Sequence, residues 1–98
     1  MKIPEKLIIG AVEWDVVFDE KETARDDAYG VCNYDASKIS ICQQSRGDNR
    51  KESAIEHTFV HETIHACLDA IGYRELSRDE TFVNSFATVM HQVIKQIK

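Results

Sequence analysis

Hydrophobic and polar positions in the first half of the chain follow the period of β-strands. Four segments are rich in β-branched and aromatic residues, and they lie at residues 7–9, 12–19, 29–34 and 38–42. The second of them alternates apolar with acidic side chains, which is the pattern of a half-buried strand. Gly10 predicts a turn after the first segment, and the polar loop 35–37 favours a hairpin between the last two. We therefore expect three or four strands within residues 6–42, with residues 20–27 as a loop that can include a helical turn and the polar stretch 43–49 as the end of the β half.

From about residue 50 the apolar spacing becomes helical. Apolar side chains recur every three or four positions on a single predicted stripe, formed by Val60, Ile64, Cys67, Leu68 and Ile71. Asn49 is a candidate N-cap with Glu52 three residues later, and Gly72 is a suitable stop. These signals predict a first long helix over residues 50–71.

A second amphipathic helix is predicted over residues 78–97, after a tight turn at 73–76. Ser77 and Glu80 have the spacing of a capping box at its start. Its broad apolar face consists of Phe82, Val83, Phe86, Val89, Met90, Val93, Ile94 and Ile97. Strands followed by helices predict one α+β domain over residues 1–98.

The charge, the apolar runs and the cysteines of the chain argue against several classes of protein. The chain has 98 residues and a formal net charge of −5, so a basic surface for nucleic acid is not expected. No apolar run approaches the roughly 20 residues of a membrane span, and the N-terminal segment lacks the apolar stretch of a signal peptide. The three cysteines, Cys32, Cys42 and Cys67, have no metal-binding or redox spacing and are expected to be reduced. These features predict a cytoplasmic protein.

The first long helix contains the pattern His-Glu-x-x-His at residues 61–65. Residues four apart lie one above the other on a helix, so the imidazoles of His61 and His65 can point at one metal ion. Glu62 is rotated by about 100° from His61, which places its carboxylate beside the ion rather than on it. There it can hold and deprotonate a water molecule. On a helical wheel both histidines border the predicted apolar stripe, where a neighbouring element can supply a further ligand.

A catalytic zinc site needs three protein ligands and one open position. Glu80 is a candidate third ligand, but its side chain is equally expected to cap the second helix by reaching back to Ser77. His91 lies about 16 Å further along that helix, so it and Glu80 cannot serve the same ion. The other residues weighed as ligands are His57, expected to be a core or hydrogen-bonded histidine, and the carboxylates of Asp69 and Asp79.

The residues around the motif resemble a known family. Residues 58–67 are similar to the extended zincin motif, and residues 80–87 look like the second helix of glutamate-type zincins (gluzincins). Within that group the chain resembles small phage and bacterial metallopeptidases related to the immunity-repressor-cleaving type. Those proteins carry Glu-x-x-Ala-Asn-x-Phe-Ala, and Val83 stands here in place of the first alanine. The resemblance implies that Glu80 is the third zinc ligand and that Asn84 holds a ligand histidine through a hydrogen bond.

The resemblance implies a minimal zincin-like fold and a zinc-dependent peptidase acting on polypeptides in a bacterial or phage-infected cytoplasm. In that reading Zn²⁺ is the cofactor and Glu62 is the general base. The strand around Ile39 and Ile41 resembles the zincin strand whose edge pairs with extended substrate. The oxyanion-stabilising residue stays open among Tyr29, Tyr34, Tyr73 and Arg74. The alternative is a non-catalytic zinc-containing module that binds another protein, such as a phage protein acting on a host factor.

Overall fold

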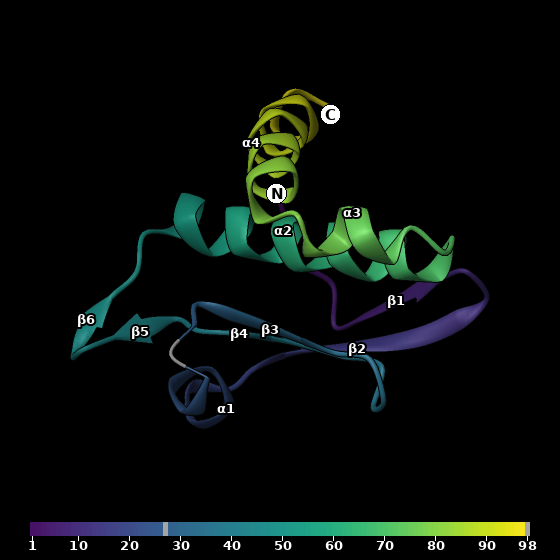
Figure 1. The fold of residues 1–98 in the computed structure, drawn as a ribbon. Helices are drawn as coiled ribbons and strands as arrows, with labels where there is room; N and C mark the ends of the chain where they lie inside the picture. The colour runs from purple at the N-terminus through teal and green to yellow at the C-terminus, as the bar shows by residue number, and fades with distance from the viewer. Residues whose placement is uncertain (27, 98) are drawn as a thin grey trace.

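A four-stranded mixed sheet forms the base of the structure, a computed structural model that describes residues 1–26 and 28–97 (Figure 1). Its strands are β1 (Lys6–Ile9), β2 (Val12–Phe18), β3 (Gly30–Asn33) and β4 (Lys38–Ile41), in the order β1-β2-β4-β3. β1 and β2 form one antiparallel hairpin and β3 and β4 another, and the parallel pairing of β2 with β4 joins them. The left-handed conformation of Gly10, at φ 57°, makes the first turn. The predicted strands, the turn at Gly10 and the hairpin between β3 and β4 are confirmed.

Two polar segments between the main predicted elements contain regular structure, and the helical turn allowed for in residues 20–27 is present. Residues 20–27 include the short helix α1 (Glu20–Arg25), which begins where an Asp19 oxygen accepts a hydrogen bond from the Glu22 amide at 3.0 Å. Residue 27 lies outside the described residues. α1 lies on the face of the sheet opposite the long helices (Figure 1). Residues 43–49 contain a small hairpin of β5 (Gln44–Ser45) and β6 (Asp48–Asn49).

The first long helix, α2 (Glu52–Ala70), lies across the sheet. It begins two residues later than predicted, because Asn49 is engaged in β6 instead of capping. The Asn49 side-chain oxygen accepts a hydrogen bond from Gln44 Nε2 at 2.8 Å, and the actual N-cap, Lys51, makes no side-chain capping bond.

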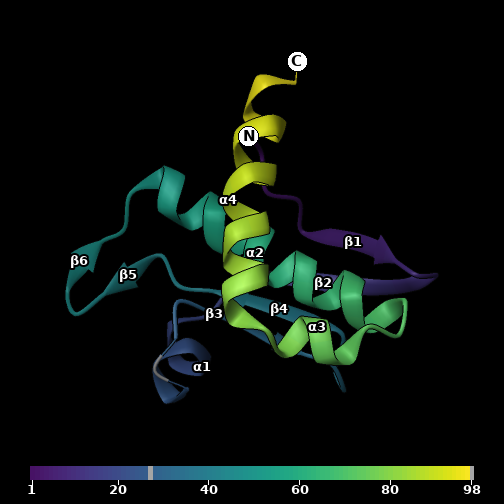
Figure 2. The same ribbon diagram turned by 45° about the horizontal axis from the view of Figure 1, so that its top comes forward.

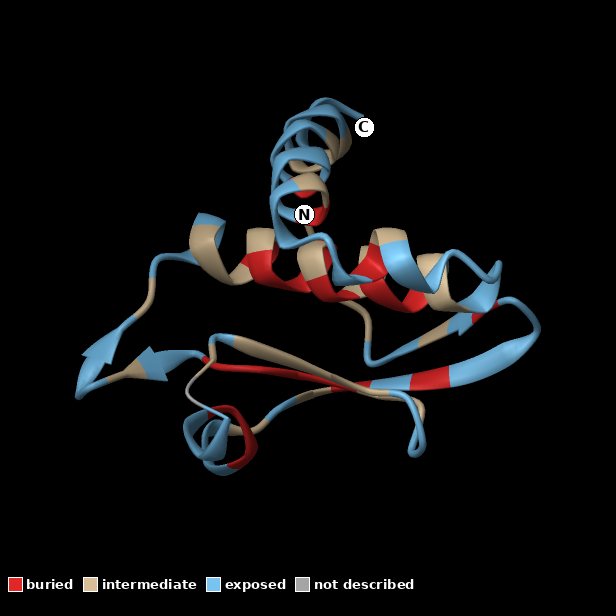
Figure 3. Cartoon of the chain, in the orientation of Figure 1, coloured by how far each residue is buried: buried red, intermediate tan, exposed pale blue. Residues whose placement is uncertain are grey.

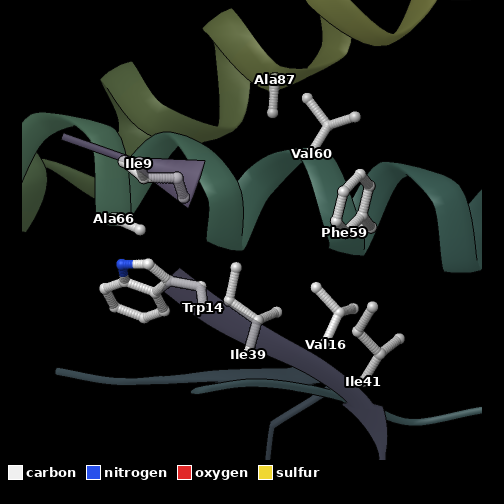
Figure 4. Packing of buried hydrophobic residues seen from close by; sticks show 9 residues of the cluster. All are labelled: Ile9, Trp14, Val16, Ile39, Ile41, Phe59, Val60, Ala66 and Ala87. Carbon is white, nitrogen blue, oxygen red and sulfur yellow. The ribbon is translucent and has the colours of Figure 1, made fainter. Parts of the chain in front are cut away.

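Helix α2 is buried on two sides, which the single predicted stripe did not anticipate. Figure 4 shows Ala66 of α2 next to Trp14 of the sheet, whereas Val60 points toward Ala87 on the crossing helix. Burial is concentrated where α2 faces the sheet (Figure 3). The predicted stripe was wrong at its C-terminal end, because Ile71 is 66% exposed past the sheet.

The chain then turns through α3 (Arg74–Arg78) into α4 (Glu80–Gln96), which crosses over α2 (Figure 2). The turn predicted at 73–76 is thus largely a short helix, and the second long helix begins at Glu80 rather than at residue 78. Its N-cap is Asp79, whose Oδ1 accepts a hydrogen bond from the Phe82 amide at 3.1 Å. The predicted capping box at Ser77 is therefore wrong.

Only one side of the predicted apolar face of α4 is packed. Val83 and Ala87 are fully buried against α2, while Phe86, Val89 and Val93 remain exposed along the outer side. The observed class is α+β, as predicted, with a mixed sheet on one side and helices above it. Among residues 1–26 and 28–97, no helix combines the length and apolar character needed to cross a membrane.

Candidate metal centre

Three side chains from two helices meet at one point. His61 and His65 lie one turn apart near the middle of α2, and Glu80 is the first residue of α4. The two Nε2 atoms are 3.2 Å apart. One carboxylate oxygen of Glu80 lies 3.1 Å from His61 Nε2, and the other lies 3.0 Å from His65 Nε2. Within the described residues these three form a cluster able to hold a metal ion.

The capping of α4 leaves Glu80 available for this contact. Asp79 supplies the oxygen that satisfies the first turn, so the Glu80 carboxylate does not turn back toward the helix start. The crossing of α4 over α2 brings its N-terminus beside the histidine pair. Of the two roles open to Glu80 in the sequence, the structure places its carboxylate against the histidines.

The spacing of the three donor groups fits a small tetrahedral cation. Two ligands of zinc at bond lengths of 2.0–2.1 Å are separated by about 3.3 Å across a tetrahedral face. The two histidine Nε2 atoms are 3.2 Å apart, close to that value, and one donor atom from each of the three residues lies within 4.8 Å of the other two. Two imidazoles and one carboxylate are also a donor set that zinc accepts, with one position left for water or substrate.

Glu62 lies beside the cluster and does not complete it. Its Oε2 is 4.0 Å from His61 Nε2, and the residue is buried. Burial, with a smaller contribution from the negative charge of Glu80, raises the pKa of the Glu62 carboxyl to about 7. On α2 the two histidines therefore face Glu80, and the Glu62 carboxylate lies next to them.

Strand β3 packs directly against this carboxylate. A side chain at Gly30 would place its Cβ 2.6 Å from Thr58 Cγ2 and 2.8 Å from Glu62 Cγ. The absence of a side chain at Gly30 therefore lets the strand approach the helix at the position of Glu62.

An open cavity of about 520 Å³ lies between β3 and the helices. It is lined by His61, Glu62, His65, Glu80, Asn84, His57, Thr58, Asp26, Cys32, Val31, Gly30, Ala28, Tyr29 and Tyr34. Strand β3 forms the outer edge of the sheet beside the cavity, whereas β4, which contains Ile39 and Ile41, is an inner strand. The expectation of a substrate edge at residues 38–42 was therefore wrong, because β3 covers that edge.

The contact between His65 Nδ1 and Ser77 was not predicted from the sequence. The buried Ser77 places its Oγ 3.0 Å from His65 Nδ1, and Tyr34 Oη lies 3.5 Å from the same oxygen. Burial lowers the pKa of His65, which favours its neutral, ligand-competent form. A serine three residues before Glu80 is a capping signal in sequence, so nothing local indicated this contact. Asn84 lines the cavity, and within the described residues its side chain makes no hydrogen bond to His61 or His65.

The other histidines have partners away from the cluster. His57 Nε2 lies 3.1 Å from Thr88 Oγ1, which agrees with the expected hydrogen-bonded histidine. His91 Nε2 lies 2.9 Å from Glu56 Oε1, on the far part of α4. Neither joins the three-residue cluster of the described residues.

The alternative carboxylates are likewise engaged elsewhere. Asp69 pairs with Arg74 at 3.4 Å, and Asp79 caps α4. Among the candidates for oxyanion stabilisation, Tyr29 and Tyr34 line the cavity, whereas Tyr73 and Arg74 are not part of its lining.

Comparison with protein-family models, curated proteins and solved structures found no match to this chain. The resemblance to gluzincins thus depends on the motif residues themselves.

Proposed function

We propose that this chain is a zinc-dependent metallopeptidase with a minimal zincin-like arrangement. The observation that carries the proposal is the convergence of His61, His65 and Glu80 from two helices, with the Glu62 carboxylate next to them. Fold class alone would not support this function, because similar α+β architectures serve many chemistries. The donor set and the additional buried carboxylate point to metal-assisted hydrolysis.

His61, His65 and Glu80 would hold the ion, and each has its donor atoms at the cluster already. A bound zinc ion lowers the pKa of water and polarises a carbonyl oxygen. Glu62 would take the proton from the attacking water; the observation that supports this role is that its carboxylate borders the cluster without belonging to it. The same carboxyl then returns the proton to the leaving amine nitrogen of the cleaved amide.

Strand β3 supports a polypeptide as substrate. It pairs with β4 on one side only, and its other side borders the cavity beside the cluster. An extended peptide can add to such an edge through main-chain hydrogen bonds, which positions a scissile bond with little dependence on side-chain identity. The three cysteines, all within the described residues, are unpaired, which supports the cytoplasmic location that we also propose.

Comparison of the wild type with Glu62→Gln separates a peptidase from a zinc-containing binding module. Both proteins are loaded with Zn²⁺, checked for metal content, and incubated with an unstructured protein whose fragments are identified by mass spectrometry. We expect equal zinc content and a roughly 10²–10⁴-fold slower cleavage by Glu62→Gln, because only proton transfer is lost. Glu52→Gln, which changes an exposed glutamate on the same helix, should cleave like the wild type.

Two results would contradict the peptidase proposal. Equal cleavage by the wild type and Glu62→Gln would mean that the carboxylate is not the base. Zinc binding that disappears in His61→Ala, together with no cleavage by any variant, would favour the binding module.

A further inference from the structure

The side of His65 that faces away from Glu80 has a partner of its own. His65 Nε2 lies 3.0 Å from Glu80, and on the opposite side of the ring Nδ1 lies 3.0 Å from Ser77 Oγ. Ser77 is 6% exposed and belongs to α3, the short helix between the two long ones. Its oxygen also lies 3.4 Å from the backbone carbonyl oxygen of His65 itself.

Proton accounting assigns a direction to these contacts when a metal is bound. A histidine that binds an ion through Nε2 and is neutral must carry its proton on Nδ1. That N–H then donates to Ser77 Oγ, and the single hydroxyl proton of Ser77 donates to the His65 carbonyl. Each donor in these two hydrogen bonds therefore has an acceptor, and the lone pair on His65 Nε2 faces Glu80 and His61.

We propose that Ser77 is the positioning residue of the metal centre, orienting His65 as a ligand from behind its ring. This inference rests on the proposed zinc site and assigns to Ser77 the role that the family resemblance implied for Asn84. A hydrogen-bonded partner on the second ring nitrogen fixes the tautomer and orientation of a ligand histidine. The Ser77 hydroxyl, unlike a carboxylate, can also donate a hydrogen bond to His65 Nδ1 when no ion is bound.

The backbone of α3 sets the serine in place. The Tyr73 amide donates to the Leu68 carbonyl at 2.8 Å, and the Ser77 amide donates to the Tyr73 carbonyl at 3.0 Å. This short helix therefore packs against α2 and ends at Arg78, directly before Asp79 starts α4. The same connection thus delivers Glu80 to one side of His65 and Ser77 to the other.

The test measures zinc affinity by competition with a chelator in the wild type and three variants. Ser77→Ala should bind zinc about 10–100-fold more weakly, as loss of such a partner does at other metal centres. Ser77→Thr retains the hydroxyl and should recover most of the affinity. Ser40→Ala is the matched control, because it also removes a buried hydroxyl, one that donates to Glu22 at 2.9 Å on the other face of the sheet. Its zinc affinity should equal that of the wild type.

A spectroscopic measurement on the wild type does not depend on whether any variant folds. In the zinc-loaded, ¹⁵N-labelled protein, the Nδ1 proton of His65 should be visible by NMR and exchange slowly with water. An Nδ1 proton that exchanges as fast as that of a solvent-exposed imidazole would overturn the proposal.

The failure of this inference and the failure of the zinc site give different results. If the wild type binds zinc and Ser77→Ala binds it equally well, the positioning role is wrong and the zinc site stands. If Ser40→Ala loses as much affinity as Ser77→Ala, the effect is general destabilisation and the positioning role is again wrong. If the wild type binds no zinc, both the zinc site and the role of Ser77 fall.

Discussion

Replacing Glu56 with glutamine removes the negative charge through which α2 contacts His91 and Lys95 of α4. The Glu56 side chain is 1% exposed, and it accepts hydrogen bonds from Lys95 Nζ at 3.0 Å and from the Met1 amino group at 3.2 Å. His91 Nε2 lies 2.9 Å from the same carboxylate. His91 and Lys95 both belong to α4, so this cluster holds the far half of the helix whose first residue is Glu80.

The magnitude follows from the pKa of this carboxyl. Its partners, led by His91, lower the pKa of Glu56 from the ordinary 4.5 to about 2. At about 1.4 kcal/mol for each pKa unit, the ionised form contributes about 3 kcal/mol to the free energy of unfolding. A lowered pKa gives stability that is complete above pH 4.5 and is lost as the pH falls toward 2. At pH 3 roughly 1 kcal/mol of it should remain.

Urea denaturation followed by circular dichroism measures this contribution directly. We expect Glu56→Gln to unfold with about 2–3 kcal/mol less free energy than the wild type at pH 7, and with a much smaller difference at pH 3. Glu5→Gln, which alters an exposed glutamate, should stay within about 0.5 kcal/mol. A difference that is the same at pH 7 and pH 3, or no difference at pH 7, would refute the assignment of this stability to the ionised Glu56.

Three further outcomes follow from packing and metal binding. Gly30→Ala should lower the free energy of unfolding by about 1–3 kcal/mol in the same urea assay, because its methyl group collides with Thr58 and Glu62; a neutral result would contradict the close approach of β3. Val83→Ala should cost about 2 kcal/mol, whereas Val89→Ala on the outer side of α4 should cost under about 0.5 kcal/mol; equal effects would mean that α4 packs differently. Free Zn²⁺ at a concentration of about 100 times its dissociation constant should raise the free energy of unfolding by about 2.7 kcal/mol, and with it the melting temperature in differential scanning calorimetry. An unchanged melting temperature would argue against a zinc site in the folded state.

Features that depend on local periodicity were predictable from the sequence. His61 and His65 share a helix, and the four-residue spacing fixes their relation wherever that helix packs. The same holds for the strands, because alternation and the turn at Gly10 are local signals. Of the four residues proposed to form the site, the three on α2, namely His61, Glu62 and His65, were therefore predictable without tertiary information.

Features that depend on competition between partners were not predictable in this way. Asn49 and Ser77 both carry capping signals, but β6 occupies the first and His65 the second. The position of Glu80 depends on which residue caps α4: the predicted cap was Ser77, whereas Asp79 makes the capping hydrogen bond in the structure. The prediction of a single apolar stripe on α2 was incomplete for a related reason. Because α2 packs between the sheet and the crossing helix α4, it has buried apolar side chains on two sides.

Zinc content after gel filtration tests the three-ligand centre most directly. The wild type, Glu80→Gln and the control Glu75→Gln, an exposed change on α3, are equilibrated with Zn²⁺ and measured by atomic absorption. We expect about one zinc ion per chain in the wild type and in Glu75→Gln, with most of it lost from Glu80→Gln. A wild type without zinc, or a Glu80→Gln variant that retains as much as the wild type, would contradict the assignment of His61, His65 and Glu80 as its ligands.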